Sequence, residues 1–153
     1  PLATIFRKDE MMESAFRTAL LEWLRADPML ALALNAISED GPAAAPAPQL
    51  SIVASAAAEW GGKTERGREA RIALELIDRS DTPGPTQALA EAIERRIATM
   101  APQQDGFRIV VTRFLRSRVE RRPRSLRAIL LEYSFRLLET AAARPAPLKE
   151  TPL

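Results

Sequence analysis

The chain of 153 residues contains no cysteine and no histidine. Without cysteine there is no disulfide, no thiolate metal ligand and no cysteine nucleophile. Without histidine, the chain lacks the commonest general base near neutral pH and the commonest metal ligand. These absences exclude histidine-dependent triads and ordinary zinc sites. We therefore expect a protein that is not an enzyme and that holds no cofactor and no metal.

Long apolar runs and aromatic residues are also scarce. No run of 18 apolar residues is present, so no membrane span is expected. The N-terminal sequence lacks the order of charged, apolar and small residues of a secretory signal, so a cytoplasmic protein is expected by default. The apolar fraction of 46% and the charged fraction of 27% are typical of a globular domain, and the net charge of +2 does not by itself indicate nucleic-acid binding.

Two long helices are predicted from apolar residues that repeat with helical spacing. The first stripe consists of Met12, Phe16, Ala19, Leu20, Trp23 and Leu24, and the second of Leu89, Ile93, Ile97 and Met100. Between them, Asp27 and Pro28 resemble an N-cap followed by proline at the first helical position, with a short helix over residues 29–35. This short helix is too brief and too apolar to read DNA bases as part of a helix-turn-helix motif.

Four strands are predicted from apolar residues that alternate with polar ones. In residues 50–58, Leu50, Ile52 and Ala54 oppose Ser51, Val53 and Ser55, although the alanines would suit a helix equally well. Residues 70–76 alternate more clearly, and period two outweighs their helix propensity. The third strand covers residues 107–119. The fourth begins at Arg127 and places Ile129, Leu131, Tyr133, Phe135 and Leu137 on one face.

The order of these elements, α-β-β-α-β-β, predicts an α+β fold. We expect an antiparallel sheet of two hairpins, with the two main helices packed on one face. The polar and proline-rich ends predict a flexible arm over residues 1–11 and a flexible tail over residues 141–153. A single domain would then cover residues 12–140.

The turn of the first predicted hairpin contains an apparent phosphate-binding loop. Gly62, Lys63 and Thr64 match the end of that motif, but the required earlier glycine is replaced by Ala57. The motif should also open a helix, whereas a strand pattern follows here. We interpret the residues from Trp60 to Gly67 as a hairpin turn and not as a nucleotide site. Trp60 is an interface anchor or a cap on the core edge; the sequence leaves both open.

The second predicted hairpin is rich in arginine. Its basic residues are Arg113, Arg116, Arg118, Arg121, Arg122, Arg124 and Arg127. They form either an exposed, solvated hairpin or a contact surface for an acidic protein or a nucleic-acid backbone. Phe114 is the one aromatic residue nearby for stacking on bases. A protein partner is therefore at least as well supported as DNA.

Several motifs resemble the tail-terminator, or tail-completion, proteins of long-tailed phages and gene transfer agents. They are Glu59-Trp60, Lys63-Thr64 and residues 66–69, followed by an alternating strand and an alanine-rich helix. Residues 106–109 and 133–136 are also similar, and the resemblance spans roughly residues 12–139. Ala70 and Phe107 replace histidines that members often carry, and an arginine-proline-arginine turn replaces the usual aspartate-glycine turn.

This resemblance implies a structural protein of the virion, located at the head-proximal end of the tail. It implies self-assembly into a ring, usually a hexamer, that stops growth of the tail tube. The other partners would be the tail-tube protein and the head–tail connector or stopper, with DNA passing through the lumen without sequence-specific binding. Interface candidates are Trp60, Lys63, Arg66, Arg68, Arg113, Arg116, Arg118, Arg121, Arg122 and Arg124. The alternative is a nucleic-acid-binding module that uses the arginine-rich last hairpin.

The sequence also leads to a prediction about the arginines in the turn of the second predicted hairpin. Arg121, Arg122 and Arg124 are expected to contribute more to assembly than to folding. Charge reversal there should leave the melting temperature unchanged and weaken partner binding, unless the arginines belong to an intramolecular network.

Overall fold

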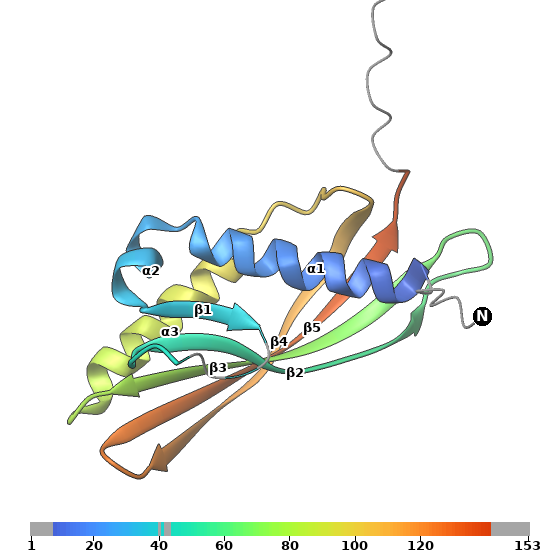
Figure 1. Ribbon diagram of the computed structural model, residues 1–153. Coiled ribbons are helices and arrows are strands. Elements are labelled where there is room, and N and C mark those ends of the chain that lie inside the picture. The colour runs from blue at the N-terminus through green and yellow to red at the C-terminus, as the bar shows by residue number, and fades with distance from the viewer. Residues whose placement is uncertain (1–7, 40, 42–43, 142–153) are drawn as a thin grey trace, which may run out of the picture.

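A computed structural model of the chain describes residues 8–39, 41 and 44–141. Three helices and a five-stranded sheet make up this part (Figure 1). The helices are α1 (Lys8–Arg25), α2 (Pro28–Ala33) and α3 (Pro83–Ala98). The strands are β1 (Ala36–Glu39), β2 (Gln49–Trp60), β3 (Gly67–Arg79), β4 (Phe107–Arg122) and β5 (Leu126–Glu139). The predicted α+β class is confirmed.

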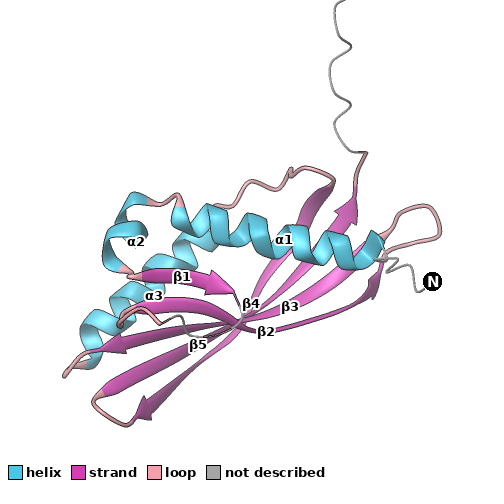
Figure 2. Ribbon diagram, viewed as in Figure 1, coloured by secondary structure: helices cyan, strands magenta, loops and turns pink. Residues whose placement is uncertain are grey.

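The sheet has the strand order β1-β2-β3-β5-β4. The two predicted hairpins, β2–β3 and β4–β5, join through antiparallel pairing of β3 with β5. Helices and sheet form two layers, and the sheet is strongly twisted (Figure 2). The tips of the two hairpins lie at opposite ends of the sheet (Figure 1).

Strand β1 was not predicted from the sequence. It pairs in parallel with the first residues of β2, and its Ile37 is buried. Four residues are too few to show a convincing alternation, and a parallel pairing depends on how the preceding helices place the chain. The short helix before it ends at Ala33, and Asp27 caps it without a side-chain hydrogen bond.

The core lies between the helical layer and one face of the sheet. Helix α1 contributes Phe16, Leu20 and Leu24, which are fully buried. Helix α3 contributes Ile93 and Ile97, whose exposed fraction is at most 1%. The sheet contributes every predicted inward residue of β5, together with Ala70, Ile72, Leu74 and Leu76 of β3. The helical and strand periods thus identified the core faces of four elements correctly.

Trp23 of α1 and Arg96 of α3 connect the two helices through hydrogen bonds and a cation–π contact. The Trp23 indole N–H donates a hydrogen bond of 2.7 Å to the Arg96 carbonyl. In return, Nε of Arg96 donates to the Trp23 carbonyl at 2.9 Å, and the guanidinium lies 3.4 Å from the indole centroid. This reciprocal contact uses carbonyls in the last turn of each helix, where backbone acceptors are open to partners outside the regular helical pattern.

The predicted alternation of β2 is wrong beyond Ile52. The pairing register with β3 shifts between Ile52 and Ala54, so Val53 forms a bulge. Ser55 pairs with buried Ile72 and accepts a hydrogen bond from Arg17 of α1, which places Ser55 on the helix side. Ala54 therefore lies on the opposite face, because one extra residue exchanges the two faces of a strand.

The predicted domain boundaries differ slightly from the observed elements. Helix α1 begins at Lys8, so the last residues of the predicted arm, 8–11, are helical. Residues 1–7 of that arm, and residues 142–153 of the predicted tail, lie outside the described residues. Among the described helices, none combines the length and the apolar character that crossing a membrane requires.

Candidate assembly interface

Strand β4 forms one edge of the sheet. The segment that precedes β4 covers this edge near the start of the strand. Gln103 forms an isolated antiparallel β-bridge with Arg108, and the Ile109 N–H donates a hydrogen bond of 2.8 Å to the Pro102 carbonyl. Beyond Ile109, no strand of the described residues pairs with the outer side of β4. The backbone groups on that side are therefore available to another chain, as on any unprotected edge strand.

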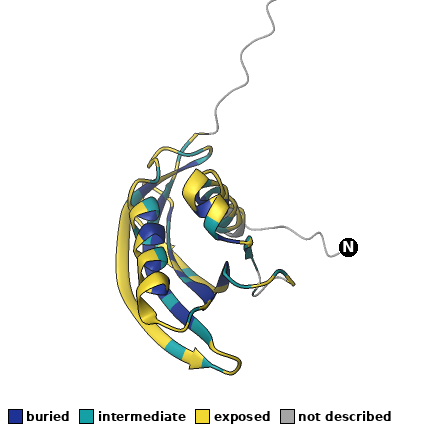
Figure 3. Ribbon diagram, turned by 90° about the vertical axis from the view of Figure 1, so that its left-hand side faces the viewer, coloured by how far each residue is buried: buried dark blue, intermediate teal, exposed yellow. Residues whose placement is uncertain are grey.

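Apolar side chains are exposed along this edge. Val119 is 57% exposed and Phe114 44%, with Val111 and Leu115 close to 40%. The helices cover only the start of β4, where Phe107 and Ile109 are buried, and Figure 3 shows the rest of the strand exposed. We call Val111, Phe114, Leu115 and Val119 the β4 apolar residues. An edge strand with such residues is a typical protein contact surface.

The face of the sheet opposite the helices is basic. The strand registers place eight arginines on this open face but only four glutamates, counted among the described strand residues. The arginines are Arg71, Arg79, Arg108, Arg113, Arg116, Arg118, Arg122 and Arg136. The glutamates are Glu69, Glu75, Glu120 and Glu132. The predicted basic hairpin is thus part of a larger charged surface that also includes β3.

Arg122 belongs to an intramolecular network. Its two terminal nitrogens donate to the two carboxylate oxygens of Glu75 at 3.1 and 2.8 Å, and a further bond of 3.2 Å reaches Glu120. The hydrogen bond to Glu75 is the main cause of a raised Arg122 pKa. Because Glu75 is only 6% exposed, Arg122 neutralises a buried carboxylate. We therefore assign Arg122 a folding role that separates it from Arg121 and Arg124.

Replacing Arg122 with glutamine should lower the free energy of unfolding by about 1–3 kcal/mol, because the Glu75 carboxylate then lacks its bidentate partner. Arg118→Gln is the matched control. Arg118 is largely exposed and pairs with Glu120 of its own strand at 3.1 Å, so a change within about 0.5 kcal/mol is expected. Urea unfolding measures both variants. Equal midpoints for the two would contradict the role assigned to Arg122.

Of the remaining arginines of the hairpin, Arg127 is partly buried and donates a hydrogen bond of 3.1 Å to the Ser80 carbonyl, whereas the others are exposed. Arg116 pairs with Glu132 across the β4–β5 ladder, and this hydrogen bond lowers the Glu132 pKa and raises the Arg116 pKa. Arg113, Arg121 and Arg124 have no ion-pair partner among the described residues. Arg124 lies in the turn with a φ of 65°. These three are the hairpin arginines most available to a partner.

Four predicted interface residues lie at the tip of the β2–β3 hairpin, and they differ in how exposed they are. Lys63 and Arg66 are exposed, and the Arg66 carbonyl accepts a hydrogen bond from Glu139 at 2.8 Å. Arg68 is turned inward and holds α1 through two bonds to one oxygen of Glu13, at 2.9 and 2.6 Å. Trp60 is half-buried, with the Arg136 guanidinium 5.2 Å from its ring. The register places Trp60 on the face of the sheet opposite the helices, and its role as an interface anchor stays a prediction.

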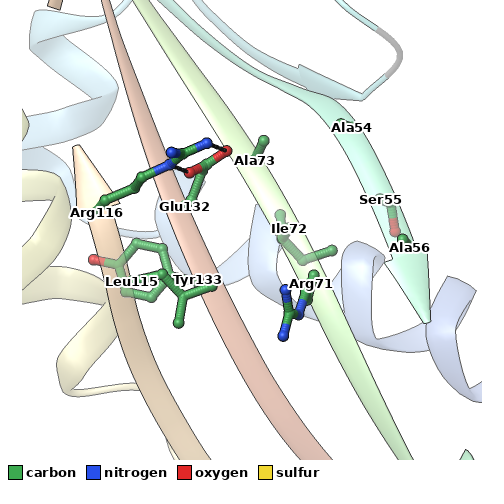
Figure 4. A pocket seen from close by; sticks show the side chains of 10 residues that line it. All are labelled: Ala54, Ser55, Ala56, Arg71, Ile72, Ala73, Leu115, Arg116, Glu132 and Tyr133. Carbon is green, nitrogen blue, oxygen red and sulfur yellow. Dashed lines mark hydrogen bonds and ion pairs between the residues drawn. The ribbon is translucent and has the colours of Figure 1, made fainter. Parts of the chain in front are cut away.

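The apparent phosphate-binding loop has the wrong structural context. Its residues form the turn between two antiparallel strands, so no helix N-terminus follows to bind phosphate. A separate hollow of about 330 Å³ lies on the sheet, with Ala54, Ala56 and Ala73 contributing its small side chains. Figure 4 shows Arg71 and the Arg116–Glu132 pair beside these alanines. Within the described residues, no three acidic residues are grouped so that they could hold a metal ion.

Sequence reasoning identified the charges of this surface but not its apolar component. The β4 apolar residues are interspersed with arginines, a composition that equally fits a strand with one covered face. Only the position of β4 at the sheet edge, beyond the reach of the helices, leaves Val119 and Leu115 exposed. No local signal in the sequence reports that position.

Comparisons with known proteins agree with a structural assembly role. The family model of tail completion protein gp17 matches residues 18–138. One similar solved structure is a chain from a "Virion of native gene transfer agent (GTA) particle". It is 24% identical, with a TM-score of 0.68, over 83% of this chain and 96% of that chain. A search of curated proteins finds no match.

The family match over most of the chain defines the class of this protein as a structural protein of phage tails. The chain belongs to the gp17 tail completion family, and the protein is a structural component of a phage-type tail. The predicted family is thereby confirmed. The structural likeness to the gene transfer agent chain supports the same fold.

Proposed function

We propose that copies of this protein form a ring, a hexamer by family resemblance, at the head-proximal end of a tail tube. The ring ends tube growth and presents its other side to the head connector or stopper of a phage or gene transfer agent. DNA passes through its lumen. The observation that carries this proposal is the family match across residues 18–138, and the exposed β4 edge supplies a surface for assembly.

Electron microscopy tests this proposal directly. The full chain, alone and mixed with purified tail tubes of its own particle, should give rings or tubes capped at one end. Light scattering should show a discrete oligomer under the same conditions. A protein that remains monomeric and leaves both ends of the tubes uncapped would contradict the ring role.

The β4 apolar residues should be needed for this assembly. Val119→Lys should weaken self-association about tenfold or more. A tenfold change in affinity corresponds to about 1.4 kcal/mol, and burying an unpaired ammonium group in the contact costs more than that. The matched control is Leu32→Lys on α2, since Leu32 is 89% exposed. Analytical ultracentrifugation compares the two. If both variants assemble normally, Val119 lies outside the contact.

The basic open face supports a second candidate function, contact with nucleic-acid phosphates. Eight arginines against four glutamates would attract a polyanion through a charge interaction that does not depend on the base sequence. Titration with duplex DNA at two salt concentrations tests this candidate. Binding should weaken steeply with salt, and no binding at low salt would remove the candidate.

A further inference from the structure

We propose that neighbouring copies join by strand pairing, with the outer edge of β4 of one copy against the second half of β2 of the next. This inference rests on the proposed ring and specifies its contact. The occupant of each edge is a second copy of this chain. Four observations on the described residues support it.

The sheet has a second uncovered edge on its opposite side. Strand β1 pairs only with Gln49 to Ile52 of β2, and the bulge at Val53 follows directly. From Val53 to Trp60, β2 has no partner strand on its outer side among the described residues. The single sheet therefore offers two different free edges, β2 at one side and β4 at the other.

Two different edges on opposite sides of one sheet make a head-to-tail contact. Such a heterologous contact uses a different surface of each subunit, and it closes into a ring when the rotation between copies allows. A two-fold contact would instead pair one edge with itself and stop at a dimer. The arrangement of the two edges thus suits a ring.

The strand directions are compatible with this pairing. Strand β2 is antiparallel to β3, β3 to β5, and β5 to β4, so β2 and β4 run in opposite directions. Rotation about a ring axis leaves the direction of each strand along that axis unchanged. Strand β4 of one copy and β2 of the next therefore meet antiparallel, the commoner pairing in sheets.

The side chains of the two edges are complementary in size and in charge. The free half of β2 begins Val53-Ala-Ser-Ala-Ala-Ala, and residues 54–58 are thus alanine and serine alone. Strand β4 offers large exposed groups, with Phe114 and Val119 on the helix side. Small side chains facing large ones allow two strands to pack closely. The β2 half also carries one acid, Glu59, and no base, whereas β4 is basic.

The row of pairing across the sheet indicates which residues meet. Ser55 pairs with Ile72, Ile72 with Tyr133, and Tyr133 with Phe114, so Ser55 and Phe114 lie in one row. Closing sheets into a ring staggers the strands by a few residues. Thr112 and Ser117, both exposed and on the helix side like Ser55, bracket Phe114 and hence the expected contact.

Disulfide cross-linking tests the pairing, and the cysteine-free chain provides a clean background. Two double variants combine Ser55→Cys with Thr112→Cys or with Ser117→Cys. The control combines Ser55→Cys with Thr18→Cys, an exposed position on α1. Each is oxidised under conditions in which the unsubstituted protein forms rings, alone or on tail tubes. The products are separated on denaturing gels without reductant.

At least one double variant should give a ladder of covalent oligomers that ends at the ring size. The Thr18 control and each single variant should give none, because Ser55 of one copy does not face Ser55 of another. Intact rings without cross-links in both double variants would overturn the edge pairing and leave the proposed ring standing. Covalent dimers from the Ser55→Cys single variant would overturn it in favour of a two-fold contact. Absence of any ring or capped tube would remove the proposed function together with this inference.

Discussion

Replacing Phe16 with alanine should lower the free energy of unfolding by about 3–5 kcal/mol, the usual cost of removing a buried phenylalanine. The side chain of Phe16 is fully buried. Its ring lies 4.6 Å from that of Phe135 in β5 and 6.3 Å, edge to face, from that of Phe107 in β4. The alanine variant would leave a cavity where α1 meets β5 and the edge strand β4.

Thermal and urea unfolding measure this effect, with a loss in melting temperature on the order of 10–20 °C. Met11→Ala is the control on the same helix, because Met11 is 60% exposed and should change stability by no more than about 0.5 kcal/mol. Phe16→Leu should lie between the two. A loss below about 1 kcal/mol for Phe16→Ala would show that α1 does not anchor the sheet at this point.

Replacing Gly67 with alanine should destabilise the protein by about 1–3 kcal/mol or more, through overpacking at the first residue of β3. A Cβ atom at Gly67 would overlap the Trp60 carbonyl oxygen, and it would lie 2.6 Å from the Trp60 indole and 3.0 Å from the Leu137 carbonyl. Two of these three neighbours are backbone atoms of paired strands. Rotation of the Trp60 side chain therefore cannot relieve the clash.

The matched control for Gly67 is Gly62→Ala in the same turn. Nothing lies within 4 Å of a Cβ atom there, and the backbone does not require glycine, so a change within about 0.5 kcal/mol is expected. Urea unfolding followed by tryptophan fluorescence compares the variants. If the Gly67→Ala and Gly62→Ala variants unfold at the same urea concentration, the close approach of Trp60 to β3 does not limit the size of the residue at position 67.

Local sequence patterns were sufficient for most elements of the fold. The residues from Met12 to Leu24 and from Ile129 to Leu137 each place their apolar side chains on one face. Such a face is buried whichever element covers it, because the hydrophobic effect is not directional. The patterns failed where a partner strand decides the outcome. The bulge at Val53 moved Ala54 to the other face, and β1 formed because the preceding helices bring Ile37 beside Leu50.

The candidate interface was predicted in part. The arginine cluster was evident from the sequence, but its division into a folding group and an exposed group was not. Arg122 meets Glu75 across 47 positions of sequence, and Arg68 meets Glu13 across 55. Such pairs depend on which strands become neighbours, so charge composition alone cannot distinguish a solvated arginine from one that neutralises a buried carboxylate.

The sequence by itself determined the class of this protein. The missing cysteine and histidine excluded cysteine nucleophiles and histidine-dependent triads, periodicity located the two long helices and the two hairpins, and the turn motif indicated the family. Only the tertiary structure decided which strands lie at the edges of the sheet. That order arises from long-range pairing, and it leaves the β4 apolar residues and the second half of β2 uncovered while burying residues of the same types elsewhere.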